Sequence, residues 1–186
     1  MVVIIVIGLL SLSLWQASLL RGSATQSGSS SLGTGTTLYP GDQGVPLPRL
    51  EGPALGDDTT LSVDDQLGHV VVINVWGSWC GPCRAEAPDL AAVSQETRPR
   101  GVRFLGIDVR DEPKAALRFE RTYGITYPSF DDPEGQLLAQ LRGIVPVGAV
   151  PSTLVVDASG VIRARVVGRV ERSALRTLIA DAEGVQ

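Results

Sequence analysis

The sequence has very few of the residues that bind metal ions or nucleic acids. Its 186 residues include two cysteines, one histidine and one lysine, Lys114. A structural zinc site needs four ligands, and two thiols and one imidazole are too few to complete one. The net charge of -4 and the scattered arginines leave no basic footprint, so we expect no nucleic-acid partner. The chain has no internal repeats, and its length suits one compact domain with an appendage.

Long apolar runs are also scarce, and only one is long enough to cross a membrane. Residues 2–20 carry no charge, and as a helix they would span roughly 28 Å, which matches the hydrocarbon core of a bilayer. Because no A-x-A cleavage site follows promptly, we expect residues 1–21 to be an uncleaved signal-anchor, with a cleaved signal peptide as the alternative. We therefore expect a single-pass cell-membrane protein with an extracytoplasmic domain. Arg21 follows the run while no basic residue precedes it, which favours the reverse orientation by the positive-inside rule.

A polar tract separates this run from the rest of the chain. Residues 22–44 are rich in Gly, Ser and Thr and have little apolar surface to bury, so we predict a flexible linker there. The pattern becomes globular at about residue 45. We therefore predict that residues 45–186 form the folded domain.

The folded domain is predicted to alternate strands and helices. The apolar run 69–76 is typical of a strand that is buried on both faces. Residues 111–124 begin with acidic residues and Pro113 and end at Gly124, which is a complete helix signature. After a short hairpin within 47–67, the expected strands are 69–76, 101–109, 125–130, 152–157 and 160–168. The expected helices are 81–97, 111–124, 133–141 and 171–184. This order predicts a three-layer α/β/α sandwich.

The two cysteines, Cys80 and Cys83, form a C-x-x-C pair that has three interpretations. A structural disulfide over so short a loop would constrain the unfolded chain very little. A structural metal site lacks ligands, and His69 is expected at the surface or the edge of a strand. A two-thiolate Cu(I) site, as in a copper chaperone, stays open because soft sulfur ligands select that ion. The third interpretation is a reactive dithiol.

The position of the pair favours the reactive dithiol. Cys80 lies between a buried strand and a helix, where the unpaired N–H groups and the helix dipole stabilise a thiolate. Pro82 suits the first helical turn because its missing N–H would have had no partner there, and Gly81 shields Cys80 very little. Cys83 lies one turn further on and is expected to point inward. We therefore predict that Cys80 is the nucleophile and that Cys83 resolves the mixed disulfide.

Three longer motifs carry a resemblance to a known family. They are "LGHVVVINVWGSWCGPCRAEAP", "DEPKAALRFERTYGITYPSF" and "VPSTLVVDASG". Over residues 45–183 the chain resembles the thioredoxin fold. More narrowly, it resembles the membrane-tethered TlpA/ResA-like thiol-disulfide oxidoreductases of cytochrome c maturation. The resemblance implies a thioredoxin-like sandwich with an N-terminal β-hairpin and a central helix-strand insertion.

The resemblance also implies roles for residues around the two cysteines. The stretch "AVPST" is similar to the family's loop with a cis-proline beside the active-site disulfide, so Pro151 is expected to be cis. Val150 before it would present its backbone to an extended substrate segment. Trp76 and Trp79 stand at the family's aromatic positions, where Trp79 would cover the disulfide; the alternative is that either is only a core residue. Pro88 stands at the family's proline after the second cysteine and is expected to kink the helix.

One acidic residue, Glu86, is expected on the same helix face as Cys83, about one turn away. It could exchange protons with Cys83, or it could only stabilise the start of the helix through the dipole. The ResA-like members have a glutamate at this place, which favours the proton-exchange role. Cytosolic thioredoxins have a buried acid at the position of Asn74, and asparagine cannot act as a base. Any side-chain assistance to proton transfer is therefore expected from Glu86.

The predicted function is extracytoplasmic thiol-disulfide exchange through Cys80 and Cys83, with no cofactor besides their redox-active disulfide. The Gly-Pro dipeptide between the cysteines is shared with cytosolic thioredoxins, whose potential is low, near -270 mV, so we expect a reductant. Electrons would come from a membrane thiol carrier, because the compartment outside is oxidising. The resemblance implies the C-x-x-C-H segment of apocytochrome c as the substrate. The alternatives are a general extracytoplasmic disulfide reductase or oxidant and, in another class, a copper-binding thiol chaperone.

Overall fold

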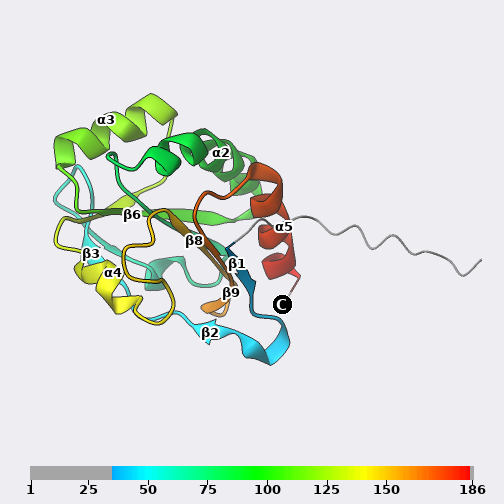
Figure 1. Ribbon diagram of the computed structural model, residues 1–186. Coiled ribbons are helices and arrows are strands. Elements are labelled where there is room, and N and C mark those ends of the chain that lie inside the picture. Colours follow the sequence, from blue (N-terminus) through cyan, green and yellow to red (C-terminus); the bar gives the residue numbers. More distant parts are fainter. Residues whose placement is uncertain (1–34, 185–186) are drawn as a thin grey trace, which may run out of the picture. The chain divides into compact units, whose positions relative to one another are not determined.

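The computed structural model describes residues 35–184, which form an α/β domain (Figure 1). The predicted signal-anchor, 1–21, and most of the predicted linker lie outside the described residues. Within 35–184, no helix is long and apolar enough to cross a membrane.

A mixed seven-stranded sheet forms the centre of the domain, with the strand order β1-β9-β8-β5-β6-β7 and β2 also paired with β9. Strands β5, β6 and β7 are parallel, whereas β8 and β9 run antiparallel to their neighbours. The bounds are β1 Thr36–Leu38, β2 Val45–Pro46, β5 Val71–Trp76, β6 Arg103–Val109, β7 Ser129–Asp132, β8 Ser152–Val156 and β9 Val161–Val167. The predicted N-terminal hairpin is β3 Glu51–Pro53 with β4 Thr60–Ser62.

The central strand β5 explains why the sheet is covered on both faces. All six of its residues are buried, and alternate side chains point to opposite faces. Val71, Ile73 and Val75 join the apolar cluster that contains Leu137 of the short helix α4, Gln136–Gln140. Val72 joins a second cluster with residues of α2 and α5. A continuous apolar strand therefore forms the middle layer, as the sequence predicts.

Three further helices complete the layers. They are α2 Gly81–Thr97, α3 Pro113–Tyr123 and α5 Arg172–Glu183, and α2 contacts both of the others. Leu175 and Leu178 of α5 are almost fully buried, and each contributes roughly 1.5–3 kcal/mol of hydrophobic stabilisation. In Figure 1, α2, α3 and α5 lie on one side of the sheet and α4 on the other. The predicted three-layer α/β/α class is confirmed.

Several elements are shorter than their predicted bounds, such as α4, which was predicted at 133–141, and two differences have a clear physical cause. Strand β7 starts at Ser129 and not at residue 125, because Ile125 N–H still caps α3 at Glu120 O and Pro128 has no N–H to donate to the sheet. Strand β1 lies inside the predicted linker, 22–44. Its threonines favour extended backbone and pair with β9, so the sheet begins upstream of the predicted domain start at residue 45.

Candidate active site

The two cysteines form a disulfide at the junction of β5 and α2. The bond joins Cys80 to Cys83 with an S–S distance of 2.05 Å. Strand β5 ends at Trp76, a tight turn follows in which Cys80 N–H donates to Gly77 O at 3.0 Å, and α2 begins at Gly81. Strand β5 and this turn therefore place the disulfide at the N-terminal end of a long helix.

Cys80 is itself the N-cap residue of α2. Its backbone is extended, and its Sγ accepts a hydrogen bond from Cys83 N–H at 3.2 Å. Pro82 lies in the first turn, where a proline costs no hydrogen bond, and both Gly81 and Pro82 are exposed. The helix continues through Pro88 to Thr97. A thiolate at Cys80 would be stabilised by the helix N-terminus, as the sequence predicts.

The exposure of the two cysteines differs less than expected. In the disulfide form Cys80 is 3% exposed and Cys83 is 1% exposed. Both belong to a buried cluster with Trp76 and Phe119, against which Val150 packs. The chemical difference between the two sulfurs therefore arises from the N-cap position of Cys80 rather than from exposure.

The predicted substrate loop lies against this cluster. The Val150–Pro151 peptide bond is cis, and Pro151 is buried at the start of β8. Val150 is half-buried, and its N–H donates to Gly148 O at 2.9 Å. The backbone N–H of Val150 is thus already used within the loop, so substrate pairing through this N–H requires that bond to open. No hydrogen bond recorded among residues 35–184 uses the Val150 carbonyl as acceptor.

A buried polar network lies beneath this end of α2. Glu86 is fully buried, and its Oε1 accepts a hydrogen bond from Asn74 Nδ2 at 2.9 Å. Its Oε2 accepts from Val170 N–H at 2.9 Å. Asn74 Nδ2 also donates to Thr153 Oγ1 at 3.2 Å, two residues after Pro151. The network ties α2, β5, β8 and the segment before α5 to one carboxyl group.

Burial raises the pKa of Glu86 from 4.5 to about 7. Desolvation is the main cause, and the nearby carboxylate of Asp89 adds to it. The hydrogen bonds from Val170 and Asn74 and the charge of Arg169 oppose the rise, because they stabilise the charged form. A carboxyl group with this pKa can both give and accept a proton near neutral pH. The recorded hydrogen bonds of Glu86 go to Asn74 and Val170, and its exchange with Cys83 stays a prediction.

The two tryptophans near the site are held in different ways. Trp76 is 1% exposed and its ring stacks on Phe119, with centroids 4.6 Å apart. Trp79 is 49% exposed, and its Nε1 donates to Val109 O at 3.1 Å. The guanidinium of Arg110 lies 6.0 Å from the centroid of the Trp79 ring. The contacts recorded for Trp79 in 35–184 connect it to the end of β6 and not to the sulfur atoms.

Sequence reasoning missed two acidic residues beside this site. Asp108 is 1% exposed in β6 and is opposite Trp76 in the sheet. The carboxylate of Asp111 accepts hydrogen bonds from the N–H and the Oγ of Ser78, in the turn that precedes Cys80. An aspartate inside an apolar strand was the available signal for Asp108, since unpaired acids are rarely buried. Nothing in the sequence pairs Asp111 with Ser78.

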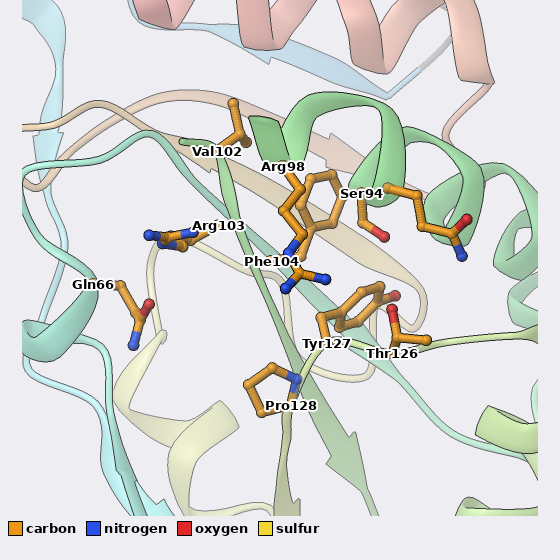
Figure 2. Close-up of a pocket in the computed structure, with 10 residues that line it drawn as sticks. Gln66, Ser94, Arg98, Val102, Arg103, Phe104, Thr126, Tyr127 and Pro128 are labelled. Atoms are coloured by element: carbon orange, nitrogen blue, oxygen red, sulfur yellow. The ribbon is translucent and has the colours of Figure 1, made fainter. Parts of the chain in front are cut away.

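A hollow lies at the other end of α2, away from the disulfide. Figure 2 shows this hollow, about 250 Å³, beside the aromatic pair Phe104 and Tyr127. It contains none of the predicted site residues. Its lining is Gln66, Ser94, Gln95, Arg98, Val102, Arg103, Phe104, Thr126, Tyr127 and Pro128. We therefore place the chemistry at the disulfide end of α2.

The site brings together a disulfide, a buried acid of near-neutral pKa and a cis-proline loop at one end of the sheet. Among residues 35–184, no group of three or more His, Cys, Asp or Glu side chains is arranged to hold a metal ion. The chemistry that these groups can perform is exchange between thiols and disulfides. Fold and site together define a thiol-disulfide oxidoreductase of the thioredoxin-fold class.

Comparison with known proteins gives the family. The model of the AhpC/TSA family matches residues 44–165, and the chain belongs to this family. It is 36% identical over 129 residues to the thiol:disulfide interchange protein DsbE of Allochromatium vinosum, covering 68% of this chain and 67% of that protein. It is 32% identical to the thiol:disulfide interchange protein HelX of Rhodobacter capsulatus, covering 67% of this chain and 66% of that protein.

Solved structures agree with this assignment. A DsbF homologue from Corynebacterium diphtheriae matches with a TM-score of 0.73 and 35% identity, over 80% of this chain and 93% of that one. A secreted thiol-disulfide isomerase from Corynebacterium glutamicum matches with a TM-score of 0.76 and 30% identity, over 81% and 93% of the two chains. The thioredoxin-like fold and the oxidoreductase class predicted from the sequence are confirmed.

Proposed function

We propose that this protein is an extracytoplasmic disulfide reductase, anchored in the cell membrane by residues 1–21, and that it reduces the C-x-x-C-H segment of apocytochrome c. The observation that carries the redox function is the Cys80–Cys83 disulfide at the N-cap of α2. The direction of electron flow is supported by the Gly-Pro dipeptide shared with the low-potential thioredoxins. The substrate and the membrane location are supported by the resemblance to the TlpA/ResA-like proteins and by the apolar run 2–20.

The proposed reaction has two exchange steps and transfers two electrons. The Cys80 thiolate attacks one sulfur of the substrate disulfide, so a Cys80–substrate disulfide forms and a substrate thiolate leaves. The Cys83 thiolate then attacks Cys80 Sγ. The Cys80–Cys83 disulfide forms, the second substrate thiolate leaves, and both substrate thiolates take up protons. In this scheme Glu86 accepts the proton of Cys83, and a membrane thiol carrier reduces the disulfide again.

Three groups are proposed to bind the substrate, namely Trp79, Val150 and Pro151. The exposed half of the Trp79 ring offers apolar area beside the turn. Val147, in the loop before Val150, is 92% exposed, and a hollow of about 160 Å³ lies between this loop, Arg110 and α4. These features favour a polypeptide rather than a small molecule as the substrate.

A trapping experiment tests the substrate and the order of the cysteines. In Cys83→Ala, Cys80 still attacks but nothing nearby resolves the mixed disulfide, so the covalent complex should accumulate. The matched variant Cys80→Ala should trap little, because Cys83 lacks the N-cap position. Trapped peptides should be enriched in C-x-x-C-H segments. Varied peptides would instead indicate a general disulfide reductase or oxidant, and equal trapping by both variants would falsify the assignment of Cys80.

Two further measurements test the remaining parts of the proposal. The reduction potential of residues 35–184 should lie close to about -270 mV and far from about -120 mV, the oxidising end of the scale. A reporter that is active only outside the cytosol, fused after Gln186, should be active. Stoichiometric Cu(I) binding that either cysteine substitution abolishes, with no covalent partners, would favour the copper chaperone.

A further inference from the structure

The turn between β5 and Cys80 is bound by one short segment that lies outside β5 and α2. Residues 77–79 form the turn, and residues 109–111 run from the last residue of strand β6 into the connection to α3. Asp111 Oδ1 accepts from Ser78 Oγ at 2.9 Å, and Asp111 Oδ2 accepts from Ser78 N–H. Both atoms of Ser78 that can donate are therefore bound to one carboxylate.

The same segment also holds Trp79. Its Nε1 donates to Val109 O, and its ring lies near the guanidinium of Arg110. The indole folds back over Gly77 so closely that a Cβ at Gly77 would lie 2.5 Å from Trp79 Nε1. Residues 109–111, at the end of β6 and the start of its connection to α3, thus fix two consecutive residues of the active-site turn.

Asp111 must be charged to do this well. A carboxylate is an acceptor only, and this one accepts from Ser78 twice and from Glu112 N–H at 2.8 Å. Hydrogen bonds to a charged acceptor are about twice as strong as neutral ones. A second negative charge next to the Asp111 carboxylate would repel it and weaken its hydrogen bonds with Ser78.

Asp108 lies next to Asp111 and is placed to be that second charge. It is buried, and neither of its oxygens receives a hydrogen bond within 35–184, although its protonated form shares one with the carboxyl group of Asp111. The charged groups that act on it most are all acidic: Asp111 from the same connection, Asp131 from β7 and Glu120 from α3. Desolvation first, then the charge of Asp111 and the hydrogen bond with its carboxyl group, and then the two more distant carboxylates raise the pKa of Asp108 to about 8. Asp108 is consequently neutral at pH 7.

We propose that Asp111 is a positioning residue for the exchange reaction, which holds the Ser78–Trp79 turn so that Cys80 stays at the N-cap of α2, and that neutral Asp108 behind it keeps this hold intact. Ionisation of Asp108 would then loosen the turn. This inference rests on the proposed disulfide exchange for its kinetic consequence, but the hold itself is a property of the folded protein that can be measured without any substrate.

The first test is a mutant cycle on the full chain. Asp111→Ala should lower the rate constant for reduction of a model protein disulfide about tenfold or more, because small misplacements of reacting groups are costly. Ser78→Ala should have a smaller effect. The double variant should be no slower than Asp111→Ala alone, because both changes break the same contact. The matched control is Asp58→Ala, an exposed aspartate outside the site, which should match the parent.

The second test measures how firmly Asp111 fixes the Ser78–Trp79 turn. It uses the oxidised protein, in which neither cysteine titrates. Trp79 emission, taken as the difference from Trp79→Phe, should change with a midpoint near pH 8. Asp108→Asn, which has the same size but cannot ionise, should abolish that step. If Asp111→Ala fails to fold, Asp111→Asn serves in its place, since it keeps one acceptor for Ser78 and should give an intermediate rate.

The outcomes separate this inference from the proposed function. An unchanged rate and unchanged Trp79 emission in the Asp111 variants, additive effects of the Ser78 and Asp111 changes, or a pH step that persists in Asp108→Asn would each overturn the positioning role. A parent protein that exchanges no disulfides would instead refute the proposed function. The emission step near pH 8 would still be present in that case.

Discussion

Glu86 and Asp108 are the least exposed carboxyl groups in residues 35–184, yet they differ in the hydrogen bonds that they receive. Glu86 receives hydrogen bonds from Asn74 and Val170, whereas the oxygens of Asp108 receive none. Desolvation is the main cause of the raised pKa in both, with values of about 7 for Glu86 and about 8 for Asp108. Equal burial therefore gives one acid that can exchange a proton at neutral pH and another that stays neutral.

The largest expected effect comes from removing the donor that distinguishes the two acids. Asn74→Ala leaves Glu86 Oε1 and Thr153 Oγ1 without their shared partner, which should lower the free energy of unfolding by about 2–3 kcal/mol. Urea denaturation measures this change. Thr153→Val removes only the second contact and should cost less. A loss in Thr153→Val as large as in Asn74→Ala would mean that Glu86 gains little from Asn74.

The next effect concerns the rate of exchange. Glu86→Gln keeps the size of the side chain but cannot carry a proton, so exchange at pH 7 should slow by about tenfold or more. The step near pH 7 should also disappear from the pH profile of the rate. Glu96→Gln, an exposed change on the same helix, is the control. If the rate and its pH profile match the parent, Glu86 only stabilises the helix, as the alternative interpretation of the sequence holds.

The effect expected for Asp108 depends on pH. The pKa of Asp108 in the folded protein, about 8, lies above its ordinary value of 3.8, so the unfolded chain loses this proton first. The stability that this group contributes is therefore complete below about pH 4 and is lost as the pH rises toward 8. Asp108→Asn cannot ionise, so it avoids this loss and should be more stable than the parent at pH 8. Near pH 4 the two proteins should unfold at the same urea concentration, and a gain that is constant with pH would contradict the raised pKa.

The smallest effect is expected from Arg169 and Asp89, two charged residues that shift the pKa of Glu86 in opposite directions. Arg169 lowers the pKa of Glu86 and Asp89 raises it, and their side chains are paired at 3.6 Å. Arg169→Gln should move the midpoint of the rate profile up, and Asp89→Asn should move it down, each by less than about half a pH unit because both charges are partly solvated. Raising the salt concentration should shrink both shifts. Shifts of the same sign would show that the charges do not act on Glu86 directly.

Local sequence signals predicted the strand-helix junction well, since β5, α2 and the C-x-x-C pair follow from apolar runs and helix signatures in adjacent residues. The network around Glu86 was beyond them, because Asn74 and Thr153 are 79 positions apart and Val170 contributes only its backbone. The exposure expected for Cys80 was too high for a similar reason. Its neighbours, such as Phe119 and Val150, come from distant elements that pack over the disulfide.

The surroundings of Asp108 could not be predicted from the sequence either. Within the apolar run of β6 it was treated as part of a buried strand, and only the arrangement of β6, β7 and α3 brings Asp131 and Glu120 toward it. Its effect on the turn then depends on Asp111, which sequence reasoning treated as an acid at the start of a helix. The chemistry of a buried acid is set by its neighbours in space, which a single sequence does not give.

The hydrogen bond from Val170 N–H to Glu86 has a practical consequence for spectroscopy. This amide is buried, belongs to a segment with no cysteine, and ends on the carboxylate at 2.9 Å. Its nitrogen and proton resonances in a ¹⁵N-labelled sample should therefore follow the ionisation of Glu86, and its exchange with deuterium should be slow. One backbone signal outside the helix would report the protonation state of the active site through oxidation and reduction.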